Sequence, residues 1–135
     1  MNSGLEMHEA SHGHLCSHLW DSDPLKLSPR ALAACQDSEN EVLFSVASVW
    51  EMQLKVQFGK LRLNLPLSEL IDSQQRINKV EILPVKLEHA LALDKLPNHH
   101  KDPFDRLLVA QAQVERAVLV SKDQIFLKYP VELIW

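Results

Sequence analysis

The chain has 135 residues, of which 46% are apolar and 24% charged, and its net charge is −4. This length fits one globular domain and is too short for two. The apolar runs are short, and the N-terminus lacks the basic and then apolar pattern of a signal peptide. We therefore expect no membrane span, no secretion and a cytoplasmic location, and no nucleic-acid binding through bulk charge alone.

The two cysteines, Cys16 and Cys35, lie in the N-terminal part of the chain. A cytosolic domain of this size needs no disulfide, so we interpret them as free or buried thiols.

The first half of the chain begins without a clear element, because residues 1–20 are rich in His, Ser and Gly and show no helix or strand period. Ser28 and Pro29 suit the cap and first turn of a helix that continues through Ala34. Residues 41–45 form an expected buried strand. A helix is predicted over 46–58, where Gly59 ends it.

The second half alternates between helix and strand patterns. Asp102 and Pro103 suit the start of a helix that reaches about Glu115. The other expected elements are helices over 67–77, 87–93 and 124–128, and strands over 80–85, 117–120 and 131–135. This alternation predicts an α/β fold with a parallel sheet covered on both faces, and ligands bind beyond the carboxyl ends of such strands.

Three carboxylates follow strand ends or helix starts: Glu51, Asp105 and Asp123. Because the carboxyl ends of parallel strands share one edge, we expect these side chains to gather there. Mg²⁺ and Mn²⁺ prefer carboxylate oxygens and can promote attack on a phosphate, whereas carboxylates without a cation repel one another. Each residue also has a simpler interpretation: a solvated helix position for Glu51, a helix-dipole or ion-pair partner for Asp105, a turn or cap for Asp123, and an N-cap for the neighbouring Asp102.

Several segments resemble the PIN-domain toxins of bacterial toxin–antitoxin pairs, the VapC type. The resemblance rests mainly on Ser45–Met52 with Gly59-Lys-Leu, on His100-Lys-Asp-Pro-Phe-Asp-Arg with the apolar helix after it, and on Leu119–Asp123. It covers about residues 15–135, so we expect a PIN-like domain over 15–135 after a divergent N-terminal segment, 1–14.

The resemblance implies a three-layer α/β/α fold and a metal-dependent endoribonuclease that uses Mg²⁺ or Mn²⁺. It also implies an RNA substrate, a homodimer and a cognate antitoxin protein. Glu51, Asp105 and Asp123 match the acidic catalytic ligands of the family, and Asp102 matches a frequent neighbour of the metal site. Ser45 and Ser48 match serines near the site, which we interpret as structural.

The N-terminal part departs from the family pattern, in which an apolar first strand ends in an aspartate. Here the strand is divergent or missing, and His14 holds the aspartate position while Cys16 and Trp20 keep their places. Imidazole is a poor ligand for magnesium, so the resemblance implies an impaired nuclease. His8, His12, His14 and His18 form a second cluster, which suits either a soft transition metal or a polar tail.

Arg106 and Lys122, next to the acidic positions, are the best candidates for RNA-phosphate contacts among basic residues that also include Lys55, Lys60, Arg62 and Lys101. Two other functions stay open. One is a catalytically silent PIN-like module that binds an antitoxin or another protein. The other is an unrelated phosphate-handling domain, which would need a nucleophilic aspartate after the first strand, and that aspartate is missing.

Overall fold

The structure is a computed structural model that describes residues 13–17, 27–98 and 102–135. Its strands are β1 (Gly13–Cys16), β2 (Glu41–Ser45), β3 (Glu81–Leu83), β4 (Val118–Val120) and β5 (Leu133–Ile134). Its helices are α2 (Pro29–Gln36), α3 (Val46–Gln57), α4 (Leu67–Ile77), α5 (Leu87–Ala92) and α6 (Pro103–Glu115), with 3₁₀ turns η3 (Leu93–Lys95) and η4 (Gln124–Lys128). The predicted order of elements is confirmed from α2 onwards.

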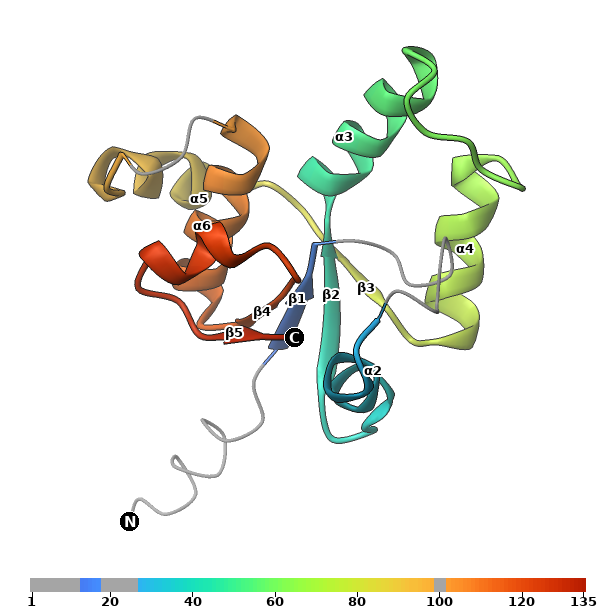
Figure 1. The fold of residues 1–135 in the computed structure, drawn as a ribbon, viewed down its shortest axis with the longest axis horizontal. Helices are drawn as coiled ribbons and strands as arrows, with labels where there is room; N and C mark the ends of the chain where they lie inside the picture. The colour runs from blue at the N-terminus through green and yellow to red at the C-terminus, as the bar shows by residue number, and fades with distance from the viewer. Residues whose placement is uncertain (1–12, 18–26, 99–101) are drawn as a thin grey trace.

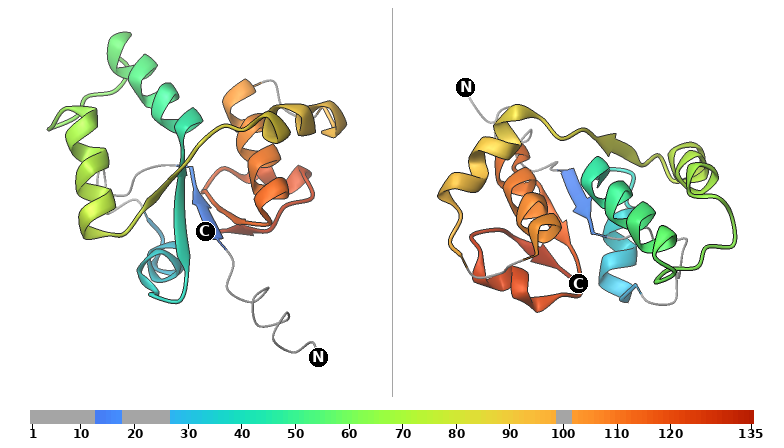
Figure 2. Two further views of the ribbon diagram at one scale, coloured as in Figure 1. Left: turned by 180° about the vertical axis from the view of Figure 1, so that it is seen from behind. Right: turned by 90° about the horizontal axis from the view of Figure 1, so that it is seen from above.

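The strands form one parallel sheet in the order β3-β2-β1-β4-β5. In Figures 1 and 2, α5 and α6 lie on one side of this sheet, and α2, α3 and α4 lie on the other. The predicted three-layer α/β/α architecture is therefore present. Within the described part of the chain, no helix is long and apolar enough to cross a membrane.

The central strand, β1, lies in the stretch where the sequence shows no strand pattern. It has only four residues, begins with a glycine and contains a histidine, but it pairs with β2 on one side and with β4 on the other. Of the two alternatives expected for the first strand, divergent or missing, the structure shows the divergent strand. Gly13 and His14, assigned above to the N-terminal segment, belong to the sheet. Residues 1–12 lie outside the described part.

Each face of the sheet has its own apolar core. Leu15, Leu43 and Leu119 point to the α6 side and pack with Leu108, Val109 and Phe126. Cys16, Val42, Phe44 and Val120 point to the opposite side and pack with Ala31, Cys35 and Met52. Each fully buried large apolar side chain contributes about 1.5–3 kcal/mol to folding. The two cores hold α3 and α6 over opposite faces of the same sheet.

Serine side chains cap two of the helices, and the cap at Ser28 was predicted. Ser28 Oγ accepts a hydrogen bond from the Ala31 N–H, and Ser45 Oγ accepts one from the Ala47 N–H. Gly59, just after α3, has a φ of 72°. A left-handed residue at this place is the usual end of a helix, and glycine adopts it without strain.

Cys16 and Cys35 are buried free thiols, as predicted, and their Sγ atoms lie 3.5 Å apart. This contact joins β1 to α2 across the core.

Candidate functional site

The topology places a binding position at the carboxyl end of β1. The chain passes from β1 to β2 on one side, and β4 lies on the other side, so the direction of winding reverses at β1. In open parallel sheets, ligands bind in the crevice outside the strand ends at such a reversal. The elements that follow β2 and β4, and the start of α6, are the ones that can line this crevice.

A row of three buried serines marks this edge of the sheet. Ser17, Ser45 and Ser121 each directly follow residues that pair across β1, β2 and β4, and each is at most 9% exposed. Their backbones continue the sheet pattern, because the Ser17 N–H donates to Val120 O and the Ser121 N–H donates to Ile134 O. Sequence analysis identified Ser45 but not the row, which depends on strand register.

α3 and α6 contact each other, and both helices begin at this edge of the sheet (Figure 1). The rings of Trp50 and Phe104 meet edge to face, with centroids 5.1 Å apart and planes at 71°. Glu51 and Asp105 are the next residues along the two helices. One contact between helices therefore brings two of the predicted acidic residues toward one another.

Two other acidic residues act electrostatically on the carboxyl group of Glu51. Burial raises the pKa of the Glu51 carboxyl, and the charges of Asp102 and Asp105 raise the pKa further. Lys55 opposes this effect, because its ammonium lies 3.9 Å from the Glu51 carboxylate. Glu51 is thus a half-buried carboxylate that two other acidic groups repel.

Asp102 has a structural role as well as this proximity. Its Oδ1 accepts hydrogen bonds from the backbone N–H groups of Phe104 and Asp105, so it caps α6 as predicted. Replacing such a cap typically costs about 1 kcal/mol. The same cap fixes the first turn of α6, which carries Asp105.

Asp123 lies after β4 at the same edge of the sheet, but unlike Glu51 it is an exposed residue that caps a 3₁₀ turn. Its Oδ1 accepts from the Ile125 N–H and caps η4, and its own N–H donates to Ser121 Oγ. It is exposed, and it does not contribute to the raised pKa of Glu51. The charges of Asp102 and Asp105 reach Glu51, but these three carboxylates do not form a group with ligand atoms within 4.8 Å of one another. Asp123 is an exposed cap after β4.

His14 does not stand at the carboxyl edge. It lies inside the sheet between Val42 and Val118, is 7% exposed, and precedes Ser17 by three residues. At about 3.3 Å per residue this is about 10 Å along the strand. Ser17 is the residue that occupies the end of β1. Neither residue brings a carboxylate, so the first strand supplies no acidic group to the edge.

The predicted RNA-binding residues lie beside the acidic residues in the sequence. Arg106 is held in place, because its Nη1 donates to the carbonyl of Pro97 at 2.9 Å. Lys122 is exposed between Ser121 and Asp123, and Lys55, Lys60 and Arg62 are exposed along and beyond α3. His8, His12, His18, Trp20 and Lys101 lie outside the described residues.

Ser45 caps α3, which is a structural role. Ser48, one turn further along α3, is 2% exposed, and its Oγ has no hydrogen-bond partner within the described segments.

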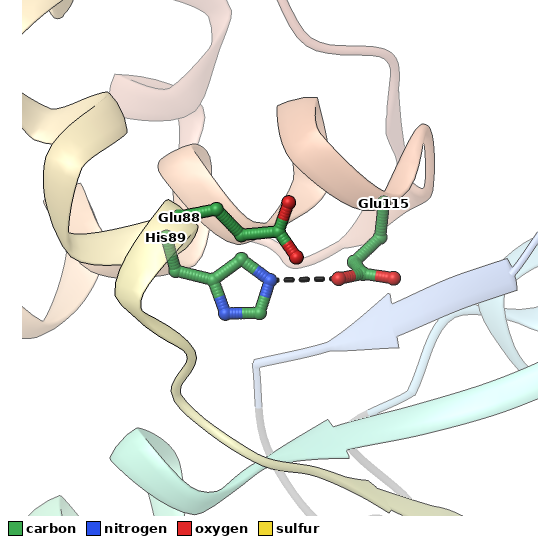
Figure 3. A group of neighbouring side chains, drawn as sticks. All are labelled: Glu88, His89 and Glu115. Carbon is green, nitrogen blue, oxygen red and sulfur yellow. Dashed lines mark hydrogen bonds and ion pairs between the residues drawn. The ribbon is translucent and has the colours of Figure 1, made fainter.

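A second titratable cluster, which sequence analysis missed, lies at the C-terminal end of α6 (Figure 3). His89 is fully buried, its Nε2 lies 2.7 Å from Glu115 Oε2, and Glu88 stands beside them. These three residues offer ligand atoms within 4.8 Å of one another, and theirs is the one such group of three among residues 13–17, 27–98 and 102–135. No local pattern signals it, because His89 and Glu115 are 26 positions apart.

The hydrogen bonds of His89 argue against a metal there. Its Nδ1 accepts from the Lys86 N–H at 3.0 Å and faces Gln111 Nε2, also a donor, at 3.3 Å. The Nδ1 atom therefore carries the lone pair, and Nε2 carries the proton that it donates to Glu115. A metal would need the lone pair on Nε2. This cluster is a buried hydrogen-bond network that joins α5 to α6.

Comparisons with known proteins agree with this architecture. Three solved structures share the fold: FitAcB from Neisseria gonorrhoeae (20% identity, 91% of this chain and 96% of that chain covered, TM-score 0.61), VapBC2 from Rickettsia felis bound to a DNA fragment from its promoter (16%, 90% and 97%, 0.60), and FitAB bound to an IR36 DNA fragment (20%, 90% and 93%, 0.60). No curated protein is significantly similar in sequence.

The sequence model of the PIN domain matches residues 17–132, which is most of the chain. The match begins at Ser17, immediately after β1, so it leaves out the divergent strand at the centre of the sheet. The chain belongs to the PIN domain family.

Proposed function

We propose that the protein is a metal-dependent endoribonuclease of the VapC toxin type, with activity reduced by the loss of an acidic group from its first strand. One observation supports this proposal: the Trp50–Phe104 contact sets the start of α6 against α3, so the charges of Asp102 and Asp105 act on Glu51 beyond the carboxyl end of the central strand. This is the position where parallel sheets bind ligands.

The donor set fits Mg²⁺ or Mn²⁺. All the groups are carboxylates, which are hard oxygen ligands, and their mutual repulsion at Glu51 is what a divalent cation would relieve. Nucleases of the PIN family generally use divalent metals. Glu51 and Asp105 would hold the ion, with Asp102 and Asp123 as neighbours. When bound, the ion supplies Lewis-acid stabilisation of phosphate charge and a more acidic water.

The protein's own residues have distinct parts in this proposal. Glu51 and Asp105 would supply the carboxylate oxygens that bind the metal ion. The cap that Asp102 makes fixes the turn that carries Asp105. Asp123, on the exposed turn after β4, would add its carboxylate to the metal site when substrate is present. Arg106 and Lys122 contact RNA phosphates and supply the local positive charge that the chain as a whole lacks.

The impairment follows from β1. The acidic residue that family members carry there is replaced: His14 is buried inside the sheet, and Ser17, a neutral hydroxyl, stands at the edge. A site with one fewer negative ligand binds a hard divalent cation more weakly.

The loss of the acidic residue from β1 also favours a second candidate function. This is a catalytically silent PIN-like module that binds an antitoxin or another protein. The solved FitAB and VapBC2 structures are named for toxin–antitoxin complexes. Under either function we propose a cognate antitoxin as partner, a homodimer and a cytoplasmic location.

Cleavage of RNA with Mg²⁺ or Mn²⁺ tests the nuclease. We expect slow cleavage that Asp105→Asn and Glu51→Gln abolish and that Ser17→Asp accelerates, because it restores a carboxylate at the edge. His14→Asp is the matched control, because it adds the same charge about 10 Å away inside the sheet and should not accelerate cleavage. Thermal unfolding should confirm that each variant folds.

Two results would contradict the nuclease. Cleavage that survives Asp105→Asn would belong to a contaminant. No cleavage by the wild type or by folded Ser17→Asp, together with no rise of Tm in Mg²⁺ or Mn²⁺, would favour the silent module.

A further inference from the structure

Two thiols meet between β1 and α2. Cys16 Sγ and Cys35 Sγ lie 3.5 Å apart in the apolar core there, although the two residues are 19 positions apart in the chain. A disulfide bond holds its sulfur atoms about 2.05 Å apart, so the pair has about 1.5 Å left to close. The chain has two cysteines, and the fold brings both into one contact.

The contact makes the two thiols chemically unequal. A hydrogen bond from the Cys16 thiol lowers the pKa of Cys35, whereas the same contact and burial raise the pKa of Cys16. Because the thiolate is the nucleophile in thiol chemistry, Cys35 is the residue that reacts first with an oxidant. The Cys16 sulfur then stands beside it to complete a bond.

Helix α2 gives an oxidant access to Cys35. The helix has eight residues, and its buried side chains, Ala31 and Cys35, are both small. A short helix that buries little apolar surface opens locally at a low cost in free energy. Cys35 is the penultimate residue of α2, and helix ends fray first.

We propose that Cys16 and Cys35 are a redox modification site, which forms a reversible disulfide with a peroxide or a low-molecular-weight disulfide as oxidant. The bond joins α2 covalently to the central strand and so acts as a latch on that helix. In a reducing compartment such bonds are transient, and cellular thiols return the pair to its reduced state. The inference does not depend on the proposed nuclease function.

The reaction with hydrogen peroxide has two steps. The Cys35 thiolate attacks one peroxide oxygen and becomes a sulfenic acid, and the hydroxide that leaves takes up a proton to form water. The Cys16 sulfur then attacks the Cys35 sulfur, and the sulfenic hydroxyl leaves with the Cys16 proton as a second water. Two thiols thus lose two protons and two electrons, and one peroxide is reduced to two waters.

The test compares folded and unfolded protein in buffers of reduced and oxidised glutathione. Intact mass gives the fraction with an intramolecular disulfide, after an acid quench, denaturation and alkylation of the remaining thiols. Folding favours a disulfide by the factor by which the disulfide favours folding, and this factor is about 100-fold for an unstrained loop of this length. Because closing the sulfur gap costs strain, we expect the folded protein to favour the bond about 10- to 100-fold more than protein in urea.

Cys35→Ala combined with Gln36→Cys is the matched control. This variant keeps two cysteines and nearly the same loop, but position 36 is exposed, so its thiol lies away from the core that holds Cys16. The preference of the folded state for the disulfide should disappear. Circular dichroism verifies that the variant folds, and the wild-type comparison with and without urea stands independently of it.

The latch has its own measurements. Oxidation of the wild type should raise the Tm by about 5–10 °C. It should also slow hydrogen exchange of the α2 amides, such as the Leu32 N–H that donates to Ser28 O.

An equal preference for the disulfide in folded and urea-unfolded protein would overturn the proposal, as would disulfides that link two chains instead of closing within one. A disulfide that lowers the Tm, or leaves exchange in α2 unchanged, would show that the bond forms only when the core opens, and it would overturn the latch. None of these measurements involves RNA or a metal ion, so this proposal and the proposed nuclease fail independently.

Discussion

Replacing His89 with alanine tests whether the Glu88–His89–Glu115 cluster is a hydrogen-bond network or a metal site. The variant removes the hydrogen bond between Nε2 and Glu115, which is worth about 1.5–3 kcal/mol because the acceptor is charged. It also leaves the Lys86 N–H without its acceptor and opens a void where a fully buried ring stood. These effects together predict a loss of about 3–5 kcal/mol in the free energy of unfolding.

Urea unfolding at neutral pH in EDTA measures this loss. Against a total of about 5–15 kcal/mol for a domain, the change should be unmistakable. Glu115→Gln keeps an acceptor but no charge, and it should cost about 1 kcal/mol. Glu88→Ala is the control. Its side chain is exposed, so the change should stay within about 0.5 kcal/mol.

A metal site would behave differently. Zn²⁺ or Mn²⁺ would then raise the Tm of the wild type, and both His89→Ala and Glu88→Ala would remove that rise. This pattern would refute the tautomer that we assign from the two donors at Nδ1.

Three further predictions concern other parts of the fold. Burial and the neighbouring Glu81 and Glu115 raise the pKa of Glu41, so the folded state binds more protons than the unfolded state. The free energy of unfolding therefore falls as pH rises from the unfolded pKa of Glu41 through its folded pKa. Urea midpoints measured across acidic pH should fall less in Glu41→Gln than in the wild type, and an identical pH profile would contradict this. Gly59→Ala should cost about 1–2 kcal/mol from backbone strain alone, because nothing lies within 4 Å of an added Cβ, and a neutral Tm would show that the turn relaxes. Asp102→Ala should lower stability by about 1 kcal/mol through the lost cap, and Asp102→Asn should restore most of it; equal effects of the two would mean that charge rather than capping matters.

The parts of the fold with strong local signals could be predicted from sequence. The bounds of β2 and α4 match their predictions, and Ser28 and Asp102 cap the helices expected of them. The strand at 131–135 is shorter in the structure, over Leu133–Ile134. β1 could not be recognised, because its four residues carry little strand propensity and owe their conformation to two neighbouring strands from distant parts of the sequence.

The site divides in the same way. Helix spacing and strand ends predict that Glu51, Asp105 and Asp123 share one edge of the sheet, and in the structure the charges of Asp102 and Asp105 raise the pKa of Glu51. The roles of Asp123, His14 and Ser17 depend on register and side-chain direction, which a single sequence does not contain. The network around His89 depends on contacts between residues more than twenty positions apart.

The place of β1 in the sheet also bears on how the chain folds during synthesis. β1 is made first among the strands, but its two partners arrive at very different times: β2 follows within about thirty residues, and β4 only after about a hundred. Until β4 has been made, one edge of β1 has no strand to pair with. The crevice at its end, and any activity that depends on it, can form only after β4 has been made.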